Sequence, residues 1–481
     1  MSNSRPIRQT NSPRPGPGAG HDFNLELPLE LDRSRPRELR AQLEHQLRGA
    51  IQHGRLAAGS ALPPSRVLAV GLGLSRSVVV EAYAQLAAEG YVEARQGSAT
   101  RVRAAPTEPA PPPPAYPPAA AFGFHSGLPD PRAFPSLVWL RHYRAALQSD
   151  IDRGLGYPRA QGESELCRAL ASYLARVRAV RTVPEQIIVC GGFTQGLALI
   201  CRMLRARGAQ RIAVENPCFS MHRTQIRAAG LEPVPIPVDV DGIDMSRLAD
   251  TDVDAVLVAP AHSYPTGVAL APERRGRLLD WAKARQALVI EDDYDADFRY
   301  DRAPIGSLQG LGPEHVIYGG TASKTLSPAL RLGWLAVPEQ LLAELVRAKF
   351  QDDIATEALG QRALARLIEA GDLARHLRRV RPIYRRRRET LVAALNEHLP
   401  GSRVTGVPAG LQVFVRLPDG VDEAEVLRAA VQRGVHVEQT ARHWAGRRAP
   451  FAALLIGFGT VHESSIEAGV RRLAEAVRSV S

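Results

Sequence analysis

A run of prolines divides this chain into a short and a long part. Residues 105–121 read APTEPAPPPPAYPPAAA, and successive prolines favour extended polyproline II backbone over helix or sheet. The run predicts a semi-rigid linker between a domain at residues 34–104 and one at residues 122–481, after a tail at residues 1–33. The chain has 481 residues, which leaves room for more than one domain at about 100–200 residues each.

The composition excludes several classes of protein. Hydrophobic residues make up 45% of the chain and charged residues 23%, which is too apolar for a largely disordered protein. No uncharged apolar run is long enough for a membrane-spanning helix, and the polar, proline-rich start lacks the apolar core of an export signal. The four cysteines follow no metal-ligand spacing. We therefore expect a cytoplasmic protein with reduced thiols, no membrane contact and no metal.

The positive charge is concentrated near the N-terminus. Residues 1–105 contain 14 arginines and 9 acidic residues, a net charge of +5 out of +11 for the whole chain. Such an excess favours a domain that binds a polyanion such as DNA. The alternative, an arginine-rich composition inherited from a GC-rich genome, accounts for the count equally well.

The first domain has the pattern of three helices and a β-hairpin. Apolar residues recur at helical spacing, and Ser65 and Ser75 are suitable N-caps for the second and third helices. A glycine turn separates two short β-rich segments. The expected elements are helices over residues 38–53, 65–71 and 76–90, and strands over residues 91–95 and 100–102. This order predicts a winged helix-turn-helix.

The motifs GRLAAGSAL, LPPSR, GLSRSVVVEAY and LAAEGYVEARQGSATRV resemble the GntR family of bacterial regulators, in order and spacing. The resemblance implies that operator DNA is contacted by the LPxxR arginine, the start of the third helix and the wing tip. An arginine there can bind guanine bidentately in the major groove. The implied contacts are Arg66, Ser75, Arg76, Ser77, Val78, Gln96 and Gly97.

The second domain alternates helical patterns with short apolar, β-branched segments, which predicts an α/β fold with a parallel sheet buried on both faces. The strands of this sheet are expected over residues 186–190, 211–215, 233–238, 255–259, 287–291, 315–319 and 333–337. A smaller α+β subdomain is expected over about residues 380–481, with strands over residues 412–416 and 453–458.

Lysine is rare, so chemistry that needs a primary amine has few candidate residues. The three lysines are Lys283, Lys324 and Lys349. Lys283 and Lys349 lie in helical patterns and fit a surface role, whereas Lys324 lies in a turn rich in Gly, Ser, Thr and Pro. An amine close to hydroxyl groups and a guanidinium suits a Schiff base with pyridoxal phosphate (PLP). The hydroxyl and guanidinium groups are those of Thr321, Ser323 and Arg331.

Two further motifs fit a PLP site. The segment IEDDYDADF ends a buried strand in carboxylates, and one of them, Asp292, can pair with a pyridine nitrogen while Tyr294 reaches the ring hydroxyl. The segment VCGGFTQG opens a helix after a glycine turn, where free N–H groups suit a phosphate. Its expected phosphate contacts are Gly192, Phe193 and Thr194. A polar strand end with capping carboxylates remains the alternative for Asp292.

Together with GLPDPRAFP, LGYPRAQGESEL and APAHSYPTGVAL, these motifs resemble the fold-type I aminotransferases, and the fusion resembles the MocR subfamily of GntR-type regulators. The resemblance implies a homodimer in which Lys324 forms the Schiff base and Thr321, Ser323 and Arg331 hold the phosphate. It also implies that Phe219 stacks on the ring and that Tyr157 reaches the phosphate of the partner subunit.

Two positions depart from the aminotransferase pattern. Tyr264 stands where an asparagine is usual, and Leu455 stands where an arginine grips the substrate carboxylate. Either Arg442 takes over this role or the carboxylate has no cationic partner. Slow or absent turnover is expected. The arginine-rich segment around residues 376–390 suits either a second DNA patch or, as we favour, an internal or dimer-facing role.

The sequence therefore predicts a PLP-dependent transcriptional regulator whose effector is either a small amino compound, which replaces Lys324 on the cofactor, or PLP itself. Contact with RNA polymerase is compatible with this role. The alternative is an active aminotransferase with a fused DNA-binding module.

Overall fold

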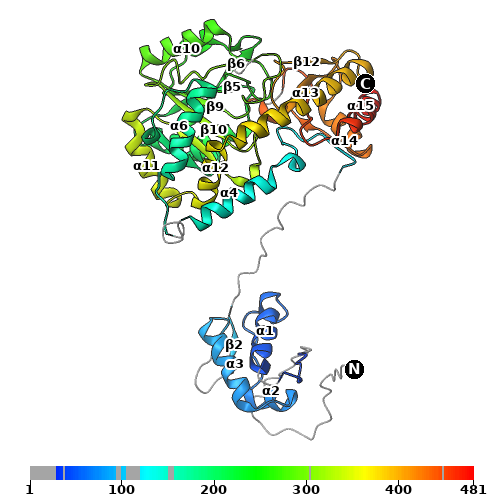
Figure 1. Ribbon diagram of the computed structural model, residues 1–481. Coiled ribbons are helices and arrows are strands. Elements are labelled where there is room, and N and C mark those ends of the chain that lie inside the picture. Colours follow the sequence, from blue (N-terminus) through cyan, green and yellow to red (C-terminus); the bar gives the residue numbers. More distant parts are fainter. Residues whose placement is uncertain are drawn as a thin grey trace. The chain divides into compact units, whose positions relative to one another are not determined.

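The computed structural model describes residues 29–35, 38–93, 99–103, 120–149, 156–302, 305–446 and 449–480. The chain forms two compact units, residues 1–116 and 117–481, and their elements are labelled in Figure 1. The boundary between the units falls within the proline-rich segment. No helix in these described ranges is both long enough and apolar enough to cross a membrane.

The smaller unit packs three helices and a hairpin around one apolar core. The helices are α1 (Leu39–Gln52), α2 (Ser65–Leu72) and α3 (Arg76–Ala88), and the strands β1 (Val92–Glu93) and β2 (Arg101–Val102) pair antiparallel. Ser75 caps α3 as predicted, since its hydroxyl accepts from the backbone N–H of Val78. The predicted cap at Ser65 is wrong. Pro64 holds the N-cap position in extended backbone, and Ser65 is already helical.

The larger unit is built on an eight-stranded sheet of order β4-β11-β10-β9-β8-β5-β6-β7. Strands β10, β9, β8, β5 and β6 run parallel, whereas β11 runs antiparallel to both of its neighbours. The seventh predicted strand is therefore present but not parallel, because only a turn separates it from β10. The strands are β4 (Ile187–Cys190), β5 (Arg211–Asn216), β6 (Glu232–Asp239), β7 (Gly242–Ile243), β8 (Ala255–Val258), β9 (Leu288–Asp293), β10 (Val316–Thr321) and β11 (Gly333–Ala336).

Helices cover both faces of this sheet (Figure 1). Alternate strand residues enter different cores, so that one face packs against α7, α8 and α11 and the other against α6, α10 and α12. The longer helices are α4 (Ser136–Gln148), α6 (Ser164–Arg178), α7 (Phe193–Ala206), α8 (Ser220–Ala228), α10 (Pro272–Arg285), α11 (Glu339–Asp353) and α12 (Ala358–Glu369).

The C-terminal part adds a four-stranded antiparallel sheet of order β12-β13-β16-β15. Its strands are β12 (Arg403–Thr405), β13 (Gln412–Arg416), β15 (Glu438–Gln439) and β16 (Ala453–Gly457), and its helices are α13 (Asp372–His398), α14 (Glu423–Gln432) and α15 (Glu463–Arg478). A short parallel pair of β3 (Phe122–Gly123) and β14 (Val435–His436) ties the start of the unit to this part.

Candidate functional site

Strand β9 places its carboxylates on opposite faces of the large sheet. Side chains alternate along a strand, so Asp292 shares a face with Leu288 and Ile290, which belong to the core beneath α7 and α8. Glu291 and Asp293 share the other face with Val289. The carboxylates predicted at the end of this strand therefore lie in two different environments, one on each face of the sheet.

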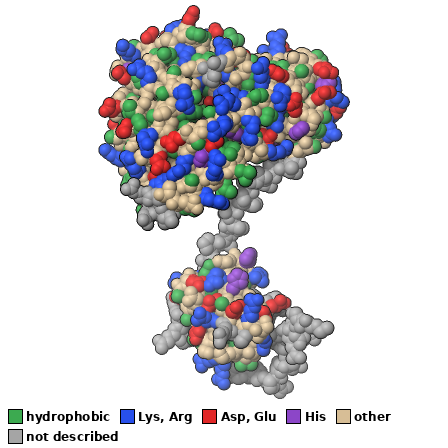
Figure 2. All heavy atoms as spheres, in the orientation of Figure 1, with side chains coloured by type: hydrophobic (Ala, Val, Ile, Leu, Met, Phe, Trp, Pro, Cys, Tyr) green, Lys and Arg blue, Asp and Glu red, His purple; other side chains and the backbone are tan. Residues whose placement is uncertain are grey.

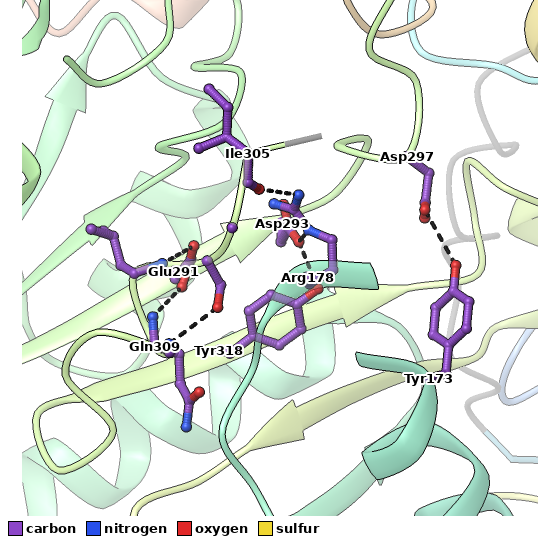
Figure 3. A network of polar contacts seen from close by, with 12 residues as sticks. Tyr173, Arg178, Glu291, Asp293, Asp297, Ile305, Gln309 and Tyr318 are labelled. Carbon is purple, nitrogen blue, oxygen red and sulfur yellow. Dashed lines mark hydrogen bonds and ion pairs between the residues drawn. The ribbon is translucent and has the colours of Figure 1, made fainter. Parts of the chain in front are cut away.

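On the face that includes Val289, the carboxylates of Glu291 and Asp293 find partners within the fold (Figure 3). Arg178 donates from Nε and Nη2 to Asp293 over 2.7 and 2.9 Å, and the Tyr318 hydroxyl donates to Asp293 over 2.6 Å. Glu291 accepts from the backbone N–H groups of two residues, 308 and 309, at 2.9 and 3.0 Å. Burial raises the pKa of Glu291 to about 7. These buried groups form a structural network.

Asp292 is buried on the opposite face without such partners. It is 8% exposed, and its Oδ1 atom has no hydrogen-bond partner among the residues described. His222 of α8 places its Nε2 at 3.6 Å from Asp292 Oδ2. Burial lowers the pKa of His222 to about 4, so this imidazole is neutral near pH 7 and no ion pair forms. Burial, with Asp293 and Asp295, raises the pKa of Asp292 well above its usual value.

Lys324 lies in the turn between β10 and β11, at the same end of the sheet. Its Nζ donates to the carbonyl oxygen of Gly127 at 2.7 Å, and burial lowers its pKa. Lys283 is exposed on α10, as expected. The surface role expected for Lys349 is wrong, because its side chain is fully buried and pairs with Asp353 at 2.5 Å. The helical pattern alone did not reveal that this position of α11 faces the core.

The glycine turn before α7 approaches Arg331 closely. Gly192 has φ +89° and is the N-cap of α7, and a Cβ atom there would lie 3.1 Å from Arg331 Nη2. The same Nη2 donates to the carbonyl oxygen of Gly191 at 2.5 Å. Phe193 begins α7 and is buried, and the next residue, Thr194, is exposed. The turn and the guanidinium therefore meet as the phosphate prediction requires.

The two hydroxyl groups of the predicted phosphate set lie next to Lys324. The Thr321 hydroxyl donates to Ser323 Oγ at 2.9 Å, and the backbone N–H of Ser323 donates to Thr321 Oγ1 at 3.1 Å. Thr321 is the last residue of β10, and from there the chain turns toward Lys324.

Aromatic side chains border a small cavity beside Asp292. Phe219, His222, Tyr264 and Asp292 line it. Phe219 packs edge-on against Tyr264, with ring centroids 5.5 Å apart, and burial raises the pKa of Tyr264 to about 12. Phe219 and the unpartnered carboxylate of Asp292 therefore border the same small cavity.

Two further residues predicted from sequence to bind the cofactor are Tyr294 and Tyr157. The hydroxyl group of Tyr294 lies 3.1 Å from His262 Nδ1, and His262 in turn pairs with Asp295 at 2.8 Å. Tyr157 is 89% exposed, so its contribution to a partner subunit stays a prediction. Sequence reasoning missed His222, His262 and Asp295, since nothing in the sequence places these distant residues together.

In the smaller unit, Arg66 and Arg76 are exposed. Ser75 caps α3, its hydroxyl lies 2.9 Å from that of Ser77, and Val78 is half-buried in the first turn of the helix. Gln96 and Gly97 lie outside the described residues. The predicted DNA contacts that can be placed therefore lie at the start of α2 and of α3.

Helix α13 uses several of its arginines within the larger unit. Arg387 donates to Asp130 at 2.7 Å and is buried, and Arg381 donates to the backbone oxygen of Asp297 at 2.6 Å. Figure 2 shows basic side chains interspersed with acidic ones on the visible face of this unit. These contacts agree with the internal role favoured from sequence.

Comparisons with known proteins define the class. A family described as bacterial regulatory proteins, gntR family, matches residues 39–102, and aminotransferase class I and II matches residues 133–446. The larger unit superposes on a multiple substrate aminotransferase from Thermococcus profundus with a TM-score of 0.70 and 27% identity, covering 75% of this chain and 92% of that one. Pyrococcus horikoshii kynurenine aminotransferase gives a TM-score of 0.69 at 27% identity, over 74% and 91%.

Two relatives match both units. The probable rhizopine catabolism regulatory protein MocR of Rhizobium meliloti is 31% identical over 90% of this chain and 93% of its own. The pyridoxine biosynthesis regulator PdxR of Corynebacterium glutamicum is 32% identical over 92% and 96%.

The chain is thus a DNA-binding regulator fused to an aminotransferase-type domain of the PLP-dependent class. It belongs to the family of helix-turn-helix transcriptional regulators that includes MocR and PdxR. The residues fit this cofactor, because the buried, unpartnered Oδ1 of Asp292 lies in the larger unit with a buried lysine and an arginine-lined glycine turn.

Proposed function

We propose that Lys324 holds PLP covalently, that Asp292 binds the protonated pyridine nitrogen, and that the Gly192–Thr194 turn, Thr321, Ser323 and Arg331 bind the phosphate. The observation that carries this proposal is the buried carboxylate of Asp292, which has an acceptor atom without a partner among the described side chains. When bound, PLP supplies an electrophilic carbon for amines and an electron-withdrawing ring.

The chain's own residues account for the remaining requirements. Burial keeps a larger fraction of Lys324 in the neutral form that can attack a carbonyl, and the contact with Gly127 orients its Nζ. The rings of Phe219 and Tyr264 place aromatic surface along one side of the site. Tyr294, which follows the same strand, hydrogen-bonds the ring hydroxyl of the cofactor. Tyr157 of a second subunit completes the phosphate site.

The DNA-binding role is assigned to the smaller unit. Arg66 and Arg76 are exposed cations at helix starts, where they can reach bases or phosphates, and Ser75, Ser77 and Val78 lie at the α3 N-terminus, which attracts anions. Gln96 and Gly97 belong to the proposed wing tip. The protein works as a homodimer on its operator, and its effector is an amino compound that competes with Lys324 for the cofactor.

Lys324→Ala tests the cofactor assignment. Purified full-length variant should lose the visible absorbance of bound PLP and should incorporate no PLP after borohydride reduction, while circular dichroism shows an unchanged fold. Lys283→Ala is the matched control, because it removes an exposed lysine from α10 and should keep full labelling. Borohydride-fixed PLP in the Lys324 variant, mapped to another residue, would contradict the assignment.

The competing function, a working aminotransferase, makes a different prediction. The protein with PLP, incubated with an amino donor and an oxo-acid, would release products over many turnovers at about 1 per second or faster. We expect far slower turnover, because Leu455 is fully buried and apolar and cannot fix a substrate carboxylate. Mass spectrometry of the products decides between the two.

A further inference from the structure

One end of the Lys324 site is formed by the small antiparallel sheet. Leu455 of β16 is paired in register with Glu438 of β15. Residues directly opposite each other in an antiparallel pair project on the same side, about 4.5–5.5 Å apart. Leu455 is fully buried and belongs to a small apolar cluster against which Tyr264 packs. Of the two side chains directly opposite Leu455 on this sheet, the one on β15 is therefore a carboxylate, and the one on β13 is Phe414.

Glu438 is connected to Lys324 through two consecutive residues. Its Oε1 accepts from the backbone N–H of Ser126 at 3.0 Å, and the next residue, Gly127, accepts from Lys324 Nζ. The negative charge of Glu438 also raises the pKa of Lys324, against the larger effect of burial. The carboxylate thus lies close enough to the lysine to influence its charge.

A second acceptor in this region has no donor. Gln412 of β13 is 4% exposed, and its Oε1 has no hydrogen-bond partner among the described residues. A Cβ atom placed on Gly127 would lie 3.4 Å from Gln412 Oε1 and 2.9 Å from Lys324 Nζ, so both side chains reach this glycine. Gln412 therefore presents an unused acceptor beside the reactive amine.

The surroundings of Glu438 add further acceptors. One ligand atom each of His125, His436 and Glu438 lies within 4.8 Å of the others. Burial and His125 lower the pKa of His436, which favours the neutral ring with one acceptor nitrogen. The guanidinium of Arg442 is bound to Glu438 Oε2 at 2.8 Å, so a ligand carboxylate could use it only by displacing Glu438.

We propose that the effector is an amine that lacks a carboxylate and carries a second ammonium group, as a short diamine does, and that Glu438 is the residue that selects it. The first amine competes with Lys324 for the cofactor, and the second donates to Glu438 and Gln412. The ion pair with Arg442 leaves lone pairs on Glu438 free for this contact. The inference rests on the proposed PLP site at Lys324.

A matched series of four-carbon amines tests the selection. PLP-loaded full-length protein is titrated with 1,4-diaminobutane, butylamine and 4-aminobutanoate, which share an aminopropyl group and end in an aminomethyl, methyl or carboxylate group. The shift of the cofactor absorbance is followed, with EDTA present to keep divalent ions off the His125–His436–Glu438 group. We expect the diamine to bind about ten- to hundredfold more tightly than butylamine, and 4-aminobutanoate most weakly. Tightest binding of 4-aminobutanoate would overturn the proposal.

Glu438→Gln should remove the preference for the diamine over butylamine. Glu425→Gln is the matched control, because its side chain is 52% exposed on α14, and the preference should persist there. An unchanged preference in the Glu438 variant would overturn the assignment of this residue. PLP loading is measured first by absorbance, since failure to load points to the Lys324 assignment, whereas normal loading with the wrong ligand order points to the effector class.

Discussion

The two faces of β9 each carry a buried aspartate, but the two aspartates differ in their hydrogen bonding. Asp293 receives two bonds from Arg178 and one from Tyr318, whereas Asp292, its neighbour in sequence, has an oxygen without a partner among the described residues. Both residues are buried, with side chains 9% exposed at Asp292 and 2% at Asp293. A buried polar group without a partner costs free energy, so its retention points to a ligand, while the satisfied group points to stability.

The arginines show the same contrast. Arg178 is buried within the larger unit and donates to Asp293 from two of its nitrogens (Figure 3). Arg48 in the smaller unit is paired with Glu89 at 2.7 Å, but Arg76 extends from the start of α3 with an exposed side chain. Charges that already have partners organise the fold, and charges without them are available for DNA.

The largest expected effect is on stability. Asp293→Asn leaves the buried Arg178 without its counter-charge, and breaking a buried ion pair from one side costs about 3–5 kcal/mol. Urea unfolding of the protein without PLP should show this loss in the free energy of unfolding. The control, Asp280→Asn on the exposed side of α10, should stay within about 0.5 kcal/mol. A loss no larger than the control's would show that the network in Figure 3 is not structural.

The next effect is on DNA recognition. Arg76→Ala should weaken specific operator binding about ten- to hundredfold, as expected when a bidentate hydrogen bond to a base is removed, with less change on unrelated DNA at the same salt concentration. Gel-shift titrations on both DNAs measure the ratio. Arg48→Ala is the control, because Arg48 is paired with Glu89 inside the smaller unit and is not among the predicted DNA contacts. An unchanged specificity ratio for Arg76→Ala would mean that this arginine contacts only the backbone, or nothing.

Local sequence signals predicted the fold well because they depend on near neighbours. Strand β13 begins and ends as expected, and the N-cap at Ser75 is confirmed. Errors arose where tertiary context decides. The burial of Lys349 depends on how α11 is oriented against its neighbours, and the direction of β11 depends on strand pairing.

The residues of the candidate site also fall into two groups: those visible in the sequence and those that depend on tertiary packing. Lys324 and Asp292 could be selected from composition and strand pattern, since a rare amine and an acidic strand end are visible in the sequence. His222 could not, because its proximity to Asp292 comes from the packing of α8 against the sheet. Glu438 is also hidden, since its link to Lys324 runs through residues 126 and 127, which lie far away in the chain.

The pH dependence of PLP loading compares the buried amine of Lys324 with the amine of an exposed lysine. Burial lowers the pKa of Lys324, so its neutral form appears at lower pH than in an exposed lysine, whose pKa is about 10.4. The loading rate should rise with pH, with its midpoint below that of Nα-acetyl-lysine, whose ε-amine is free, measured alongside. Glu438→Gln should move the midpoint lower still, because the charge of Glu438 favours the protonated amine. A midpoint at or above that of Nα-acetyl-lysine would contradict the burial argument.

The smallest expected effect on stability is at Asp292. Asp292→Asn removes no ion pair, because His222 is neutral near pH 7 and 3.6 Å away, and it removes a carboxylate that burial disfavours. The free energy of unfolding without PLP should therefore change by less than about 1 kcal/mol, or increase. PLP affinity should fall, since an asparagine cannot supply the charge that stabilises a protonated pyridine nitrogen.

The same urea series used for Asp293→Asn, together with PLP titrations, measures both quantities. Equal destabilisation by the two substitutions would erase the distinction between the two faces of β9, and unchanged PLP affinity in the Asp292 variant would remove Asp292 from the site.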